Sequence, residues 1–119
     1  MEDIIAKVAA AAGVDSSIAE KAVGAILGFL KKEAPAEHVE TMMAKLPGAD
    51  ALIAMAPSGG MFGGMGGIMG LGSQLMSAGL SMGQVQTVGR TLFASAREEV
   101  GEETMGQIVS SIPGLSQFV

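Results

Sequence analysis

Residues 13–48 read GVDSSIAEKAVGAILGFLKKEAPAEHVETMMAKLPG, and this stretch decides the fold. Helix-breaking residues divide it at Gly13, Pro35 and Pro47-Gly48. Between these breakers the apolar residues recur every three or four positions, which is the spacing of one helix face. The stretch therefore predicts two amphipathic helices that meet at Pro35. Their apolar faces carry Ile18, Ala22, Val23, Ile26, Leu27 and Leu30 in the first helix and Val39, Met42, Met43 and Leu46 in the second.

The start of the first of these helices has two candidate caps, Asp15 and Ser17. The spacing Ser17-x-x-Glu20 is typical of a capping box, in which two side chains and two backbone N–H groups pair reciprocally. Ser81-x-x-Gln84 has the same pattern later in the chain. We expect a helix to begin at each of these two places.

Two further helices are expected in the first half. Acidic residues open the stretch 2–12, where they complement the helix dipole, and Gly13 suits a left-handed helix end. After the break at residues 47 and 48, a short helix capped by Asp50 is expected to carry Leu52 and Ile53.

The second half repeats this plan when the numbering is shifted by 66. We interpret residues 1–53 and 67–119 as two copies of a three-helix unit with a short terminal helix, packed about a pseudo-twofold axis within one domain, 1–119. The alternative is that two unrelated amphipathic hairpins match at this offset by coincidence. Matched pairs are Gly13 and Gly79, Glu33 and Glu99, Val39 and Met105, Met42 and Ile108, Met43 and Val109, Leu46 and Ile112, and Pro47 and Pro113.

Composition favours an all-α bundle. Of the 119 residues, 49% are hydrophobic and only 3% aromatic, so Ala, Leu, Ile, Val and ten Met must supply the core. The net charge of −5 argues against nucleic-acid binding, and the absence of cysteine excludes disulfides and thiol chemistry. The acidic start MEDII lacks the basic region of a secretory signal, so we expect a cytoplasmic protein.

Residues 59–72, GGMFGGMGGIMGLG, lie in a stretch without charge that runs from residue 51 to residue 89. No lysine follows Lys45, so a phosphate-binding Walker loop is excluded, and the dinucleotide fingerprint is incomplete. The uncharged run is long enough for a membrane span but has too few strongly apolar residues and no flanking Lys or Arg. A span is not expected, and peripheral membrane contact stays open. The repeat predicts a helix from residue 68 onward.

Residues 54–66 are expected to connect the two copies. A simple linker is usually rich in Gly and Ser, whereas this segment is rich in Gly and Met. Methionine-rich surfaces accept varied apolar partners. The segment is therefore either a connector packed on its own core or an apolar interaction surface. The candidate surface consists of Met61, Phe62, Met65, Ile68 and Met69, and we expect the following helix to turn Leu71, Leu75 and Met76 inward.

The sequence offers no catalytic constellation. His38 is the single histidine, so neither a zinc site nor a serine–histidine–aspartate triad is expected. The acidic run at 98–103 lacks the alternating ligands of a calcium loop and is expected to serve a helix start. Arg90 and Arg97 lie on or near the same helix face, where they could bind an acidic partner or, as we expect, pair with Glu98 and its neighbours. We expect no enzyme activity, cofactor or metal.

Two segments carry a resemblance: AEKAVGAILGFLKKEAPAEHVETMMAKLPGADALIAMAP and GLSMGQVQTVGRTLFASAREEVGEETMGQIVSSIPG. They resemble uncharacterised bacterial all-helical domains of unknown function, of the VcgC/VcgE type, in the helix pair, the LPGAD-like turn and the Gly-rich middle. The resemblance covers most of the chain and implies an all-α fold. It implies no activity and no site residue.

These observations favour a non-enzymatic helical interaction or scaffold protein that associates with itself or with a protein partner. The alternative is a carrier of an apolar ligand, such as a fatty acyl chain, held between the two copies. An enzyme would need a polar pocket that the sequence does not display.

Overall fold

The computed structural model describes residues 2–55, 72–73 and 75–112, and none of these forms a strand. The prediction of an all-α fold is confirmed. Residues 72, 73 and 75–77 are also helical. The helices with described bounds are α1 (Glu2–Ala12), α2 (Ser16–Glu33), α3 (Ala36–Lys45), α4 (Ala49–Met55), α6 (Met82–Val100) and α7 (Glu102–Ser111).

The helices end where the sequence places its breakers. Gly13 follows α1 with a φ of 69°, a left-handed conformation that favours glycine. Pro35 separates α2 from α3 and stands at the N-cap of α3. Gly101 takes the same place between α6 and α7 with a φ of 108°, and its N–H donates to the carbonyl oxygen of Arg97. The chain therefore turns sharply between α2 and α3 and again between α6 and α7.

One of the two predicted capping boxes is confirmed and the other is wrong. At the start of α6, the Ser81 hydroxyl accepts from the Gln84 N–H, and the Ser81 N–H donates to Gln84 Oε1 at 2.9 Å. Helix α2 instead begins directly after Asp15, with no side-chain cap bond. Because Ser17 already lies inside the first turn, its hydroxyl cannot form the predicted box with Glu20.

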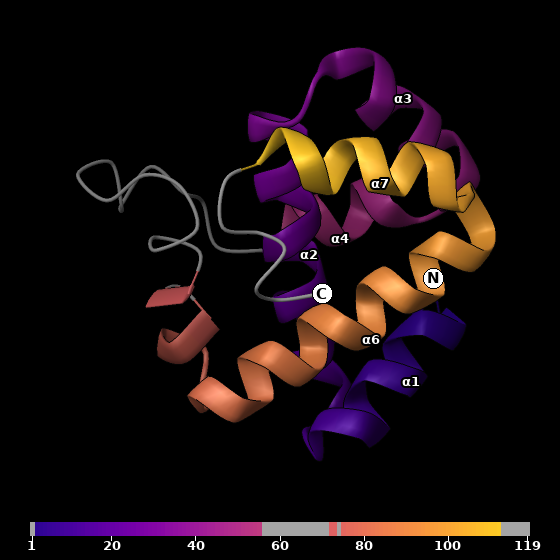
Figure 1. The fold of residues 1–119 in the computed structure, drawn as a ribbon. Coiled ribbons are helices and arrows are strands. Elements are labelled where there is room, and N and C mark those ends of the chain that lie inside the picture. The colour runs from indigo at the N-terminus through magenta and orange to yellow at the C-terminus, as the bar shows by residue number, and fades with distance from the viewer. Residues whose placement is uncertain (1, 56–71, 74, 113–119) are drawn as a thin grey trace.

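The buried residues form a core to which α1–α4, α6 and α7 all contribute. Helix α1 packs on α2 and α6, α2 packs on α4, and α3 packs on α7 (Figure 1). The predicted apolar stripes of α2 and α3 face this core, with only Ile18 and Met43 partly exposed. Helices from the two halves of the chain thus cover the same core.

A hydrogen bond reinforces the contact between the two halves. Gln84 Nε2 donates to the carbonyl oxygen of Ala12, the last residue of α1, at 3.1 Å. The same side chain closes the capping box of α6 through its oxygen. Gln84 therefore ties the end of α1 to the start of α6.

The prediction that Met76 points inward is wrong, because its side chain is 49% exposed. Leu75 is 1% exposed and occupies the core in this segment. Successive helical residues point about 100° apart, and here the core lies on the side of Leu75, which leaves Met76 directed toward the surface. Leu71 lies outside the described residues.

Candidate functional site

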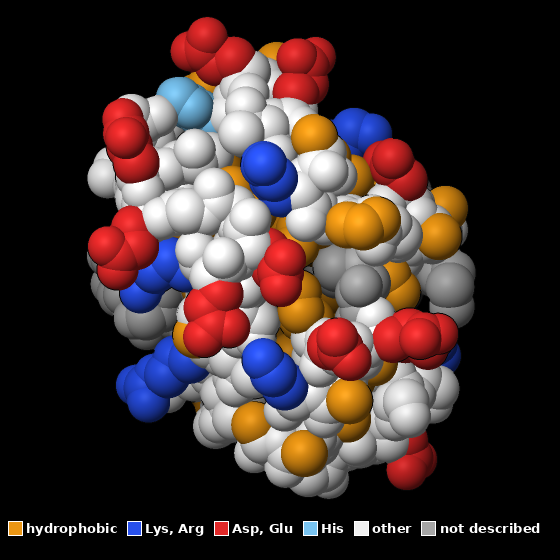
Figure 2. All heavy atoms as spheres, turned by 90° about the vertical axis from the view of Figure 1, so that its right-hand side faces the viewer, with side chains coloured by type: hydrophobic (Ala, Val, Ile, Leu, Met, Phe, Trp, Pro, Cys, Tyr) orange, Lys and Arg blue, Asp and Glu red, His pale blue; other side chains and the backbone are white. Residues whose placement is uncertain are grey.

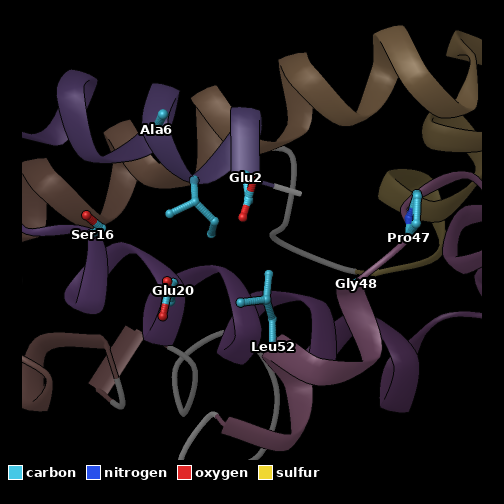
Figure 3. A pocket seen from close by; sticks show the side chains of 8 residues that line it. Glu2, Ala6, Ser16, Glu20, Pro47, Gly48 and Leu52 are labelled. Atoms are coloured by element: carbon cyan, nitrogen blue, oxygen red, sulfur yellow. The ribbon is translucent and has the colours of Figure 1, made fainter.

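A groove of about 410 Å³ lies between the first turns of α1, the start of α2 and the turn into α4. Figure 3 shows side chains from α1 on one side of this space and from α2 and α4 on the other. We call it the α1–α2–α4 groove. It is lined by Glu2, Ile5, Ala6, Ser16, Glu20, Pro47, Gly48 and Leu52.

The wall of the groove is apolar. Ile5 and Leu52 are each 7% exposed, so most of their surface already belongs to the core, and their remaining surface lines the groove. The Leu46-Pro47-Gly48 break positions Leu52, because α4 starts immediately after it and the Leu52 N–H donates to the Gly48 carbonyl at 3.2 Å. The helix break predicted from sequence thus places one wall of the groove.

Two carboxylates give the groove its charge. Glu2 is exposed in the first turn of α1, and Glu20 is half-buried one turn into α2. Neither forms an ion pair with another residue of the described part of the chain. No lysine or arginine lines the groove. Its electrostatic character is therefore acidic over an apolar wall.

A second depression, of about 430 Å³, lies between α1 and α6 and is lined by Lys7, Arg90, Thr91, Ala94, Ser95 and Glu98. Lys7 Nζ lies 3.9 Å from a Glu98 carboxylate oxygen. The sequence predicted that Glu98 would pair with the arginines of its own helix, and this is wrong, because the described ion pair joins α6 to α1. The cation and the carboxylate neutralise each other across the depression.

The predicted interaction surface, Met61, Phe62, Met65, Ile68 and Met69, lies outside the described residues, as does most of the predicted connector 54–66. Within the described part of the same uncharged stretch, two large apolar side chains are exposed. They are Met76, at 49%, and Met82, at 60%.

Away from this stretch the surface is charged. On the face drawn in Figure 2, acidic and basic side chains are interspersed, and hydrophobic side chains reach the surface between them. The overall balance of charge is negative, at −5.

The described residues hold no group of three or more His, Cys, Asp or Glu side chains that could bind a metal ion. The His38 side chain is 26% exposed, and its Nε2 lies 3.9 Å from the Glu37 carboxylate. Among the described helices, none is both long enough and apolar enough to cross a bilayer.

Comparison of the chain with family models, with curated proteins and with solved structures finds no match. The resemblance to VcgC/VcgE-type domains therefore stays a prediction.

Sequence reasoning did not find the α1–α2–α4 groove. It assigned Glu2 to the dipole of its helix and Glu20 to a capping box. The groove depends on how α1 and α4 each pack on α2, which is a tertiary arrangement that local patterns do not encode. The sequence feature that points toward the groove is the helix break at residues 47–48, because α4 begins after it and carries Leu52, which forms part of the apolar wall.

Proposed function

We propose that this chain is a non-enzymatic helical interaction protein that self-associates through its uncharged stretch, residues 51–89. The observation that carries the proposal is the exposure of Met76 and Met82 within that stretch. Both side chains leave much of their apolar surface in contact with water in the monomer. Burying that surface against a second copy lowers the free energy by about 25 cal/mol per Å² of apolar area. A cytoplasmic location remains part of the proposal.

The charge distribution supports this assignment. An uncharged surface lowers the desolvation cost of an interface, and the cores of protein interfaces are depleted in charge and enriched in methionine. Every Lys, Arg, Asp and Glu of the chain lies outside residues 51–89. The two exposed methionines mark the described part of the surface that is best suited to association.

We also infer that the fold contains two copies of one helical unit. The shift that aligns the two halves of the sequence also aligns their helices. It carries the start of α2, Ser16, onto the start of α6, Met82, and the whole of α3, Ala36–Lys45, onto α7, Glu102–Ser111. Helices related by this shift contact each other, α2 with α6 and α3 with α7, and a twofold axis that passes between these pairs would produce such contacts.

Backbone hydrogen bonds support the same inference, because they recur at the same offset. Four bonds from a backbone N–H to a backbone carbonyl oxygen in the first half each have a counterpart in the second half. With the donor residue first and the counterpart in parentheses, they are Val14 to Ala9 (Leu80 to Leu75), Ala19 to Asp15 (Val85 to Ser81), Val39 to Pro35 (Met105 to Gly101) and Leu46 to Met43 (Ile112 to Val109).

Sedimentation equilibrium over a range of concentrations tests self-association. We expect the intact chain to form a dimer or larger species, and the double variant Met76→Glu/Met82→Glu to shift toward monomer. The matched control is Ala10→Glu/Ala44→Glu, which adds the same charge at exposed positions of α1 and α3. A monomeric intact chain, or equal effects of the two double variants, contradicts the proposal.

The carrier function has less support. An acyl chain held between the halves needs an apolar cavity there, whereas the described depression between α1 and α6 is lined by Lys7, Arg90 and Glu98. The core residues Val88 and Leu92 of α6 are 0% and 1% exposed. Native mass spectrometry that finds a lipid bound to the purified chain would favour the carrier instead.

A further inference from the structure

We propose that the α1–α2–α4 groove binds a basic side chain, an arginine or a lysine next to an apolar residue, on a segment of a different protein. This goes beyond self-association, because it assigns a second surface with its own partner. The two surfaces differ in chemistry: self-association uses the exposed Met76 and Met82, whereas the groove combines the carboxylates of Glu2 and Glu20 with an apolar wall.

The apolar wall suits the stem of such a side chain. Arginine and lysine place three or four methylene groups along apolar surface while their charged end stays at a polar rim. Ile5, Ala6 and Leu52 offer that surface (Figure 3). A volume of about 410 Å³ accommodates one long side chain together with part of an apolar neighbour.

The two carboxylates of the groove favour a positively charged ligand. Glu2 and Glu20 supply two carboxylates, with no lysine or arginine in the lining and no ion pair to a described residue. The starts of α1 and α2 each contribute about half a positive charge, which the two full negative charges exceed. A cation therefore gains from both carboxylates, and Arg can form paired hydrogen bonds with either.

The same positions of the second half do not carry this chemistry. In the register that aligns the two halves, Glu2 corresponds to Ile68, Glu20 to Gln86, and Ser16 to Met82. The acidic pair belongs to the first half alone. Under the duplicated arrangement, this chain therefore has one basic-segment site rather than two equivalent ones.

The groove is an anchor point rather than a whole interface. Specific protein interfaces bury about 800 Å² on each partner, and a few central residues, often Arg, carry most of the binding energy. One side chain in this groove fits that role. Exposed ion pairs are individually weak and are screened by salt, so the affinity of the isolated contact is low and depends on ionic strength.

The test uses the full chain and a defined probe. The probe is an acetylated, amidated pentapeptide with arginine between two leucines, and its control contains citrulline, which has the same shape without the charge. Backbone amide chemical shifts are followed during titration. The variant is Glu2→Gln/Glu20→Gln, and the matched control is Glu99→Gln/Glu103→Gln, two exposed acids of α6 and α7.

We expect the arginine peptide to shift the amides of Ala6, Ser16 and Gly48, with a Kd raised about three- to tenfold by the groove variant or by citrulline. The control variant and the Met76→Glu/Met82→Glu variant should bind as the intact chain does, so failure of self-association leaves this test unaffected. Equal binding of both peptides overturns the proposal. So does a concentration-dependent shift of these amides without peptide, since the occupant is then a second copy.

Discussion

Replacing Gln84 tests how strongly the two halves of the chain are joined. Its amide oxygen accepts from the Ser81 N–H at 2.9 Å, and its amide nitrogen donates to the Ala12 carbonyl at 3.1 Å. Gln84→Ala removes both bonds in one step. Gln84→Glu keeps an acceptor for the cap but loses the donor to Ala12.

The two bonds set the size of the expected effect. An intramolecular hydrogen bond contributes about 1 kcal/mol, and the Gln84 side chain makes two, while Ser81 stays the N-cap residue in every Gln84 variant. We therefore expect Gln84→Ala to lower the free energy of unfolding by about 2 kcal/mol. Gln84→Glu should lower it by about 1 kcal/mol, because the carboxylate still caps α6 and favours its N-terminus.

Urea denaturation followed by circular dichroism measures these differences from the midpoint and slope. The matched control is Gln86→Ala, an exposed position on the same helix, which should change the free energy of unfolding by less than about 0.5 kcal/mol. The reasoning is refuted if Gln84→Ala is as mild as this control, or if Gln84→Glu is the more destabilising of the two Gln84 variants.

Three further predictions concern folding stability and use the same denaturation assay. Gly28→Ala should raise the free energy of unfolding by about 0.5–1 kcal/mol, since a methyl group there would lie 3.6 Å from Ile53, in ordinary contact. Gly101→Ala should lower it by about 1 kcal/mol or more, because residue 101 has a φ of 108°. Equal effects of the two substitutions would contradict the assigned backbone conformations. Leu92→Ala, at a position 1% exposed, should cost about 2–5 kcal/mol, and a loss below about 1 kcal/mol would place it outside the core. Lys7→Met should change stability by less than about 0.5 kcal/mol, because its pair with Glu98 joins side chains that are 57% and 75% exposed; a larger loss would mean that this pair holds α1 to α6.

The fold class and most helix boundaries were predictable, because they follow from local chemistry. Gly13, Pro35 and Pro47-Gly48 interrupt the helical pattern, and the structure turns the chain at each of them. Apolar spacing identified the buried faces of α2 and α3, since a helix that packs on one side repeats every three to four residues. These signals act within a few residues and need no knowledge of the partner helices.

The errors occurred where two local solutions compete or where tertiary packing decides. Asp15 and Ser17 both suit a helix start, and α2 begins directly after Asp15 without a side-chain cap bond, so local cap chemistry alone did not decide between them. Leu75 and Met76 are neighbouring apolar residues, and the packing of the segment on the core buries only Leu75. The α1–α2–α4 groove brings Glu2, Glu20 and Leu52 together from three helices, so no short pattern could reveal it.

Both halves of the chain fold around one shared core, which then presents the interaction surfaces. Native-state hydrogen exchange measures this claim directly, because amides that open only with the whole fold report the same free energy. We expect the slowest amides of α2 and of α6 to give equal opening free energies within about 0.5 kcal/mol and the same response to urea. Two distinct free energies, one for α1–α4 and one for α6 and α7, would show two separately folding halves and contradict the shared core.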